Sequence, residues 1–270
     1  MKLCRFQLLE FNAAAASRSG ETVHPEPRIG RIEGDAVHEL SGSLLGKTET
    51  TGRTFKLSEV ALLPPSVPTK IVCVGRNYVE HAAEFNSDIP KEPLIFLKPP
   101  SAILAPGEPI VLPEISKRVD YEGELCVVIA RRCRQLSDTD DVNPYIAGYT
   151  CLNDVSARDL QFADAQWTRA KGFDTFCPFG PLLETDLDLK RVTVETYLNG
   201  QKKQSAPVTD MIFSVDAIIR WVSRVMTFEP GDIIATGTPS GVGPLAASDV
   251  VEVVISGVGT LRNPVQAANS

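Results

Sequence analysis

The stretch DYEGELCVVI, residues 120–129, places two glutamates at the start of a run of apolar, β-forming residues. Side chains alternate along a strand, so Glu122 and Glu124 are predicted to point to the same face. Two carboxylates this close repel each other unless they are exposed, protonated or neutralised by a cation. An exposed strand face is the simpler interpretation. Because residues 125–129 read as a buried strand and Gly123 permits close approach of the carboxylates, we favour the neutralised arrangement.

A third carboxylate, Asp154, ends a second apolar segment at residues 149–153. If this segment forms a strand beside the first, Asp154 lies next to Glu122 and Glu124. Three hard oxygen donors with room for water suit Mg²⁺ or Mn²⁺. Asp154 is also placed to act as a turn or helix-capping aspartate just ahead of Ser156, and the two roles are compatible.

The composition is that of an ordinary soluble globular protein, with 43% hydrophobic and 23% charged residues. The net charge of -7 and the scattered Lys and Arg residues argue against a nucleic-acid partner. No apolar run approaches the ~20 residues that span a bilayer, and the N-terminal residues lack the features of a signal peptide. The six cysteines show no Cys-x-x-Cys spacing. They are expected to be buried free thiols of a cytoplasmic protein.

The chain is predicted to be a mixed α+β protein, mostly β. A Pro-rich segment at residues 63–68 suggests a small N-terminal β domain at residues 1–66 and a larger domain at residues 67–270. Long β runs, few helices and no repeating strand–helix–strand rhythm favour a β-sandwich or roll over a doubly wound sheet.

Local patterns predict the elements within these domains. Helices are expected at residues 78–85, at about 157–170 after the capping-box pattern Ser156-x-x-Asp159, and at 215–226. Strands are expected at residues 3–11, at 28–40 with a Gly34-Asp35 turn followed by a polar loop, at 70–74, at 192–198 before an Asn199-Gly200 turn, and at 250–255.

A candidate general base follows the predicted strand at 70–74, in the segment GRNYVEHAAE at residues 75–84. On a helix His81 and Glu84 share a face, so the carboxylate can orient the imidazole and raise its basicity. This is the outline of a general-base dyad, and an exposed surface pair is the alternative. The other two histidines lie in the N-terminal unit, which leaves His81 as the candidate imidazole base of the main domain.

Two further segments are candidates for contact with an anionic substrate. Lys171 lies in the aromatic-rich segment 167–178, where it either complements a helix C-terminus or holds a substrate anion or an enolate oxygen. The segment IIATGTPSGVG, residues 233–243, leads from a strand into a Gly-rich loop whose backbone N–H groups could cradle a carboxylate. A tight turn is the alternative, and the loop matches neither the phosphate-loop nor the dinucleotide fingerprint.

Together and in this order, these motifs resemble the fumarylacetoacetate hydrolase family. The resemblance covers about residues 68–265 and does not extend in detail to the N-terminal unit. The matching segments are GRNYVEHAAEF (75–85), LKPPSA (97–102), DYEGELCVVI (120–129), NDVSARDLQ (153–161), KGFDTFCPFGP (171–181), NG (199–200) and GDIIATGTPSGVG (231–243).

The resemblance implies a fumarylacetoacetate-hydrolase-like β-sandwich roll with an active site built on the sheet, usually in a homodimer. It also implies Mg²⁺ or Mn²⁺ as the cofactor. The site residues that it implies fall into three groups: metal ligands at Glu122, Glu124 and Asp154; catalytic residues at His81, Glu84 and Lys171; and substrate-binding residues at Arg76, Gln161 and Thr238.

The implied function is metal-dependent cleavage of a C–C bond in a small 2-oxo acid, by acylpyruvate hydrolysis or oxaloacetate decarboxylation. The alternative within catalysis is an isomerase or decarboxylase of 2-hydroxyhepta-2,4-diene-1,7-dioate, which needs the same metal and proton shuttle and a pocket for a second carboxylate. An alternative of another class is a non-catalytic β module whose acidic cluster binds Ca²⁺ structurally or mediates contacts. The base and the cation beside the cluster argue against it. No nucleic-acid or membrane partner is expected.

Overall fold

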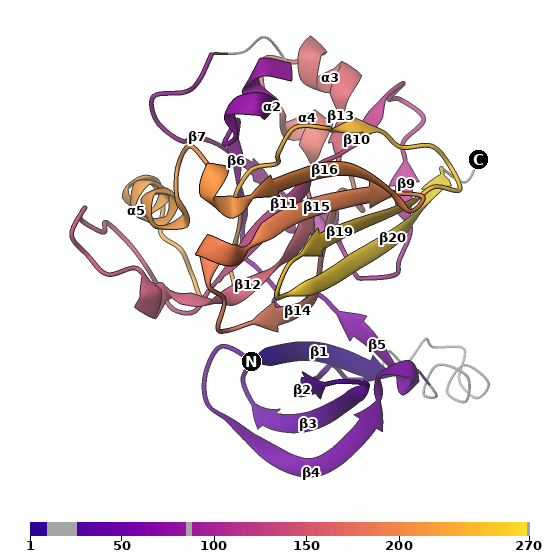
Figure 1. Cartoon of the computed structure of the whole chain (residues 1–270), viewed down its shortest axis with the longest axis vertical. Helices are drawn as coiled ribbons and strands as arrows, with labels where there is room; N and C mark the ends of the chain where they lie inside the picture. Colours follow the sequence, from indigo (N-terminus) through magenta and orange to yellow (C-terminus); the bar gives the residue numbers. More distant parts are fainter. Residues whose placement is uncertain (10–25, 85–87, 269–270) are drawn as a thin grey trace.

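The computed structural model describes residues 1–9, 26–84 and 88–268. Within these residues the protein is mostly β, as predicted, and it forms one large and two smaller sheets (Figure 1). No helix in this part of the chain has the length and hydrophobicity needed to cross a membrane. The helices are α2 (Val79–Glu84), α3 (Arg158–Ala163), α4 (Thr168–Lys171) and α5 (Val215–Val225), with short 3₁₀ turns η2 (Leu57–Glu59), η3 (Pro100–Ala102), η4 (Asn143–Tyr145), η5 (Leu189–Arg191) and η6 (Val208–Asp210).

The largest sheet has 12 strands and extends from the N-terminal residues into the main body. Its path is β4-β3-β2-β1-β14-β12-β11-β17-β6-β7, with β5 beside β1 and β8 beside β14. The strands are β1 (Lys2–Leu8), β2 (Arg28–Glu33), β3 (Ala36–Gly42), β4 (Thr48–Lys56), β5 (Val60–Leu63), β6 (Ile71–Gly75), β7 (Leu94–Lys98), β8 (Ile103–Leu104), β11 (Gly123–Ile129), β12 (Ile146–Asn153), β14 (Cys177–Glu184) and β17 (Ile233–Ala235).

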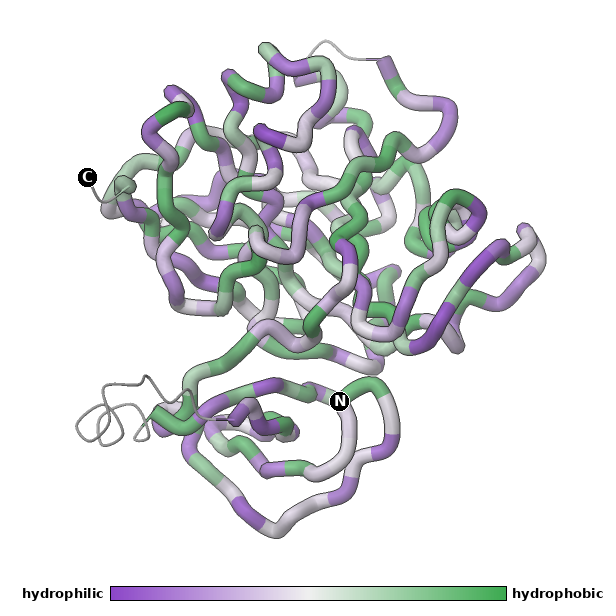
Figure 2. Tube along the Cα trace, turned by 180° about the vertical axis from the view of Figure 1, so that it is seen from behind, coloured by the Kyte–Doolittle hydropathy of each residue, from purple (hydrophilic) through white to green (hydrophobic). Residues whose placement is uncertain are grey.

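Strands β1 to β4 form an N-terminal lobe below the main body in Figure 1. Hydrophobic and hydrophilic stretches alternate along these strands (Figure 2). The lobe is joined to the main body by strand pairing as well as by the chain, because Lys2 of β1 lies opposite Glu184 of β14. The division of the chain at residue 66 stays a prediction.

A five-stranded sheet packs against one face of β11. Its order is β16-β15-β19-β20-β9, and a three-stranded sheet, β13-β10-β18, lies beside the site described below. The strands are β9 (Ile110–Leu112), β10 (Val119–Tyr121), β13 (Ser156–Ala157), β15 (Thr193–Leu198), β16 (Gln201–Pro207), β18 (Gly243–Pro244), β19 (Val250–Ile255) and β20 (Gly259–Ala267).

Residues of β11 alternate between two cores. Leu125 and Val127 join the core that contains the β15 and β19 side chains, and Cys126 and Val128 join the core on the opposite face. Gly123 faces β15, where a Cβ atom would lie 2.0 Å from Thr196 Oγ1. This glycine therefore lets the two sheets approach, a different reason from the carboxylate contact expected from sequence.

The helix predicted at about 157–170 is confirmed only in part, because it is divided into α3 and α4 by residues 164–167. Ser156 is extended and pairs with Asp120 of β10, so it does not cap a helix, and its hydroxyl donates to the Asp154 carbonyl at 2.9 Å. The Asp159 carboxylate accepts from Ser116 Oγ at 2.6 Å instead of completing a capping box. Asp164 is extended at the end of α3, and the helix resumes at α4. Pairing of β13 with β10 thus holds Ser156 and Ala157 in a strand, and the helical segment begins only at Arg158.

Most other local predictions are confirmed in the described residues. The Gly34-Asp35 turn joins β2 to β3. The turn between β15 and β16 has φ +52 at Asn199 and +76 at Gly200, as a two-residue hairpin requires. The predicted polar loop after residue 40 is wrong, because β4 pairs with β3 there; β4 is an almost wholly exposed edge strand, so it shows no apolar alternation. The predicted ends at residues 11 and 85 lie outside the described residues.

All six cysteines are buried and free, as predicted. Burial raises the pKa of Cys151 and of Cys177 to about 12, so these thiols stay neutral. They serve as small apolar residues of the core.

Helix α5 is confirmed, with the Ser214 hydroxyl accepting from Ala217 N at 3.3 Å as its N-cap. Ile219 on this helix is completely buried in the core. Ile219→Asp should therefore lower the free energy of unfolding by about 3–5 kcal/mol, since it buries an unpaired charge.

Chemical denaturation measures this loss, and Val225→Asp on the same helix is the matched control. Val225 is 56% exposed, so its substitution should change stability by no more than about 0.5 kcal/mol. Equal effects of the two substitutions would contradict the packing of α5 described here.

Candidate metal and substrate site

Three buried carboxylates meet where β11 and β12 run side by side. The antiparallel register sets Glu124 opposite Leu152, and Asp154 N donates to the Glu122 carbonyl at 2.8 Å. One oxygen from each of Glu122, Glu124 and Asp154 lies within 4.8 Å of the others. The juxtaposition expected from the two strand segments is therefore present.

Basic side chains surround two of the three carboxylates. Lys171 Nζ donates to Glu122 Oε2 at 2.8 Å and to Asp154 Oδ2 at 2.6 Å. Arg158 Nη2 donates to Glu122 Oε1 at 2.6 Å, and Lys98 Nζ donates to Asp154 Oδ1 at 2.5 Å. Although burial alone would raise it, the charges of Lys171 and Arg158 hold the pKa of Glu122 well below its ordinary range.

Glu124 is the carboxylate without such a cation. Its Oε2 accepts from Gly237 N at 2.7 Å, and it forms no ion pair with any of the described residues. Burial, with added repulsion from Asp154 and Glu122, raises its pKa well above the ordinary value. Glu124 is thus a buried carboxylate beside two others, and no described basic side chain forms an ion pair with it. The oxygens of the three carboxylates are hard donors, and such a set fits a divalent cation.

Lys171 ends α4 and is buried with the cluster. Burial would lower its pKa, but the charges of Asp154 and Glu122 outweigh that effect and raise it. Its ammonium group also lies 4.9 Å from the centre of the Phe96 ring. Lys171 is therefore held as a cation and is suited to stabilise an anion, not to accept a proton.

The dyad predicted on α2 is formed. His81 is buried, and its Nδ1 donates to Glu84 Oε2 at 3.1 Å. With the proton on Nδ1, the lone pair is on Nε2, which is the atom that a general base needs. The other oxygen of Glu84 accepts from Gly241 N at 2.7 Å, so the pair is not an isolated surface contact.

The Gly-rich loop binds carboxylates of the protein itself. The N–H group of Gly237 donates to Glu124, and that of Gly241 donates to Glu84. Neither N–H group is therefore available to bind a substrate carboxylate, contrary to the expectation from sequence. The Thr238 hydroxyl is also engaged, donating to the Gly123 carbonyl at 2.9 Å and accepting from Gln204 Nε2 at 2.8 Å.

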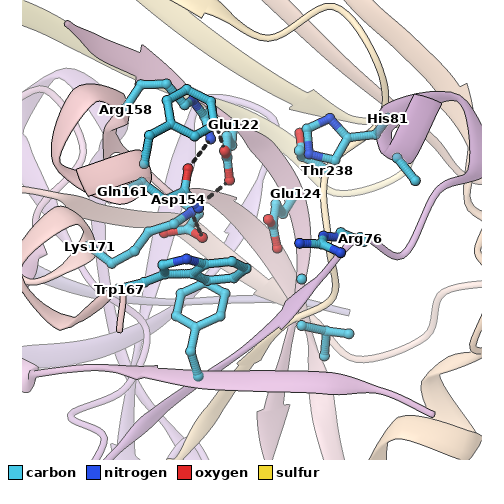
Figure 3. A pocket seen from close by; sticks show the side chains of 15 residues that line it. Arg76, His81, Glu122, Glu124, Asp154, Arg158, Gln161, Trp167, Lys171 and Thr238 are labelled. Atoms are coloured by element: carbon cyan, nitrogen blue, oxygen red, sulfur yellow. Dashed lines mark hydrogen bonds and ion pairs between the residues drawn. The ribbon is translucent and has the colours of Figure 1, made fainter. Parts of the chain in front are cut away.

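The cluster opens into a cavity of about 260 Å³. His81 and Arg76 lie on one side of it, Gln161 and Lys171 on the other, and Glu122 and Glu124 between them (Figure 3). Glu84 supports the cavity from behind His81 and is not part of its lining. The predicted site residues in its lining are Arg76, His81, Glu122, Glu124, Asp154, Gln161, Lys171 and Thr238.

Two of the lining residues show how a substrate anion could be held. Arg76 adopts a left-handed conformation, with φ +60, and forms no ion pair within the described part of the chain. Gln161 Oε1 accepts from Arg158 Nη1 at 2.6 Å, which turns its amide N–H₂ group toward other partners.

Sequence reasoning did not assign a role to Lys98, Arg158 or Asp120. Lys98 is completely buried, and Arg158 Nε donates to Asp120 Oδ2 at 2.9 Å while its other arm contacts Glu122. Lys98 and Arg158 stand inside the quoted motifs LKPPSA and NDVSARDLQ. A basic residue within each of these motifs is the signal that could have identified them.

The fold and the site define a class: mostly β proteins with a buried acidic centre, a flanking lysine and a His–Glu pair on a short helix. Residues 70–266 match the model of the fumarylacetoacetate (FAA) hydrolase C-terminal family, and residues 1–65 match the Rv2993c-like N-terminal model. The chain therefore belongs to the fumarylacetoacetate hydrolase family, which is an enzyme family.

Individual relatives agree with this assignment. The chain is 55% identical to an uncharacterized protein of Methanocaldococcus jannaschii over 74% of this chain and 84% of that protein. It is 42% identical to the oxaloacetate tautomerase YisK of Bacillus subtilis, over 78% and 75% of the two chains. A crystal structure of 2-hydroxyhepta-2,4-diene-1,7-dioate isomerase from Mycobacterium marinum superimposes with a TM-score of 0.87 at 42% identity, covering 100% of both chains.

Proposed function

We propose that this protein is a divalent-metal-dependent enzyme that cleaves a C–C bond in a small 2-oxo acid, by acylpyruvate hydrolysis or oxaloacetate decarboxylation. The observation that carries the proposal is the buried carboxylate cluster, whose Glu124 forms no ion pair with a described residue, faced across one cavity by His81 of the His81–Glu84 dyad. Glu122, Glu124 and Asp154 would hold Mg²⁺ or Mn²⁺, which when bound supplies positive charge for the substrate carboxylate and 2-oxo oxygen.

In the hydrolytic reaction His81 Nε2 accepts a proton from water, and Glu84 stabilises the imidazolium that forms. The water oxygen bonds to the distal carbonyl carbon. The C–C bond then breaks, and its electron pair forms the enolate of pyruvate. The His81 imidazolium returns its proton to C3 of this enolate, which gives pyruvate and the carboxylic acid of the distal group. Lys171 contributes a fixed positive charge near the enolate in a buried, water-poor site, where such a charge is most effective.

Decarboxylation uses the same anion and needs no water attack. The bond between the distal carboxylate and C3 breaks, carbon dioxide leaves, and the electron pair again forms the pyruvate enolate. Lys171 stabilises the enolate, and protonation at C3 gives pyruvate. Arg76, whose guanidinium has no carboxylate partner among the described residues, is placed to orient the distal carboxylate beforehand.

A second candidate function is keto–enol tautomerisation of oxaloacetate. The name of the Bacillus subtilis relative supports it. So does the position of His81, which can move a proton at C3 while Lys171 stabilises the enolate oxygen. Isomerisation of a 2-hydroxydienedioate, the activity in the name of the Mycobacterium marinum protein, uses the same proton shuttle. In that reaction Arg76 would bind the second carboxylate.

The resemblance to the family also supports three proposals that accompany the function. The enzyme is proposed to act as a homodimer, to work in the cytoplasm, and to bind neither nucleic acid nor membranes. The net charge of -7 is consistent with the absence of a nucleic-acid partner.

Turnover assays separate these activities. Oxaloacetate and a series of short acylpyruvates should be consumed with Mg²⁺ or Mn²⁺ and not after chelation, and readdition of the metal should restore activity. Pyruvate formation identifies cleavage, whereas loss of the enol absorbance without pyruvate identifies tautomerisation. The proposal is refuted if none of these substrates reacts in a metal-dependent way.

Metal titration with and without oxalate tests the structural-metal alternative. Oxalate mimics the carboxylate and 2-oxo oxygens of the substrate, so it should tighten metal binding at a catalytic site. A structural Ca²⁺ site gains nothing from this chelating ligand.

A further inference from the structure

A larger groove lies directly outside the site cavity. It has a volume of about 890 Å³ and runs along β7 and residues 165–168, which belong to the connection between α3 and α4 and to the first residue of α4. Apolar side chains of β7, Leu94 and Leu97, are 38% and 46% exposed beside it. Three residues line both spaces: Arg76, Phe96 and Trp167. These residues therefore form the boundary between the acidic site and the groove.

The two aromatic residues of this boundary form a fixed pair. The Phe96 and Trp167 rings meet edge to face, with centroids 5.2 Å apart and planes at 76°. The indole also rests on Gly75, where a Cβ atom would lie 3.1 Å from Trp167 Cζ3. Figure 3 shows Trp167 beside Lys171 at the edge of the pocket. The rings therefore border the position of the reacting anion as well as the groove.

The break between α3 and α4 places Trp167 at this boundary. Arg169 donates two hydrogen bonds to Asp164, at 2.9 and 2.7 Å, and so clamps the connecting segment. A single continuous helix would change the path of residues 164–167 and with it the position of Trp167. The interruption between α3 and α4 therefore determines where the indole lies relative to the site.

We propose that Trp167, supported by Phe96, is a specificity-determining residue that limits the length of the substrate. It closes the 260 Å³ cavity against the 890 Å³ groove, so the wild-type enzyme prefers 2-oxo acids whose distal group is small, such as a carboxylate or a methyl ketone. Removal of the indole joins the two spaces and admits a long apolar or aromatic distal group along β7. The inference rests on the proposed function, of which it specifies the substrate class.

The experiment compares kcat/KM for acetylpyruvate and for an acylpyruvate with a phenyl substituent, at fixed Mg²⁺, in wild type and Trp167→Ala. The ratio of the long to the short substrate should rise by roughly tenfold or more, as expected when a pocket gains room for several carbon atoms. Trp167→Phe should give an intermediate ratio. Gln166→Ala is the matched control: Gln166 lines the groove but not the site, so its ratio should equal that of wild type.

Phe96→Ala repeats the test from the other ring, in case loss of the indole impairs folding. A ratio unchanged in both alanine variants, or equal losses for the two substrates, would overturn the proposal. Calorimetric measurement of the binding of 2-oxobutanoate and 2-oxo-4-phenylbutanoate with Mg²⁺ distinguishes failure of the Trp167 proposal from failure of the proposed function. If wild type turns over neither acylpyruvate, only the proposed hydrolysis is refuted. A selective gain of phenyl-ligand binding in Trp167→Ala would still support the role of Trp167 in separating the cavity from the groove.

Discussion

Replacing Glu124 with glutamine is expected to lower metal affinity and activity by at least about 100-fold while the protein stays folded. The substitution keeps an oxygen that can accept from Gly237 N and removes the one carboxylate charge of the cluster that forms no ion pair with a described residue. Loss of a ligand should cost more than loss of a group that only orients ligands, for which about 10–100-fold is typical.

The same substitution should raise the melting temperature of the metal-free protein at neutral pH. The pKa of Glu124 is raised in the folded state, so folded protein binds this proton more tightly than the unfolded chain does. The ionised carboxylate therefore opposes folding once the pH exceeds the unfolded value of about 4.3. Glutamine removes that penalty, and the difference in melting temperature should shrink as the pH is lowered toward this value.

Calorimetric titration with Mg²⁺ and thermal melting after chelation measure these effects. Glu114→Gln is the control, since Glu114 is exposed and belongs neither to the carboxylate cluster nor to the lining of the cavity. Full activity of Glu124→Gln, or of chelated wild type, would remove the carboxylates from the proposed metal site.

Replacing His81 with alanine should slow acylpyruvate hydrolysis by about 10²–10⁴-fold, the usual contribution of a general base. Decarboxylation of oxaloacetate should suffer less, because its C–C bond breaks without activation of water. Steady-state kcat/KM for both substrates at fixed Mg²⁺ gives the comparison. His38→Ala is the control, because that histidine lies in the N-terminal lobe on β3.

Lys171→Ala distinguishes the base from the cation of the site. Both reactions pass through an enolate, so loss of this ammonium group should weaken both. It also leaves Glu122 and Asp154 without their shared partner, so the variant should be assayed below its measured melting transition.

Equal losses on both substrates in His81→Ala would mean that the dyad positions α2 over the site, and the role of His81 in activating water would have to be withdrawn.

Much of the core strand pattern could be predicted because it depends on local alternation. The apolar run after Glu124 gives β11 its two buried faces, and the Asn199-Gly200 pair has the φ values that its hairpin needs. Predictions failed where a distant segment competes with a local preference. Ser156 has a capping sequence, yet strand pairing with Asp120 holds it extended.

By itself the sequence determined that this protein is mostly β and that Glu122 and Glu124 share one face. It put Asp154 beside them only if the two strand segments pair, and the structure shows that they do. Only the tertiary structure decided which charges neutralise these carboxylates, since Lys98 comes from an edge strand and Lys171 from a short helix. It also decided that the Gly-rich loop binds the protein's own carboxylates and that Trp167 lines both the cavity and the groove. The physical reason is that periodicity depends on neighbours in the chain, whereas pairing of buried charges depends on which segments the fold brings within hydrogen-bonding distance.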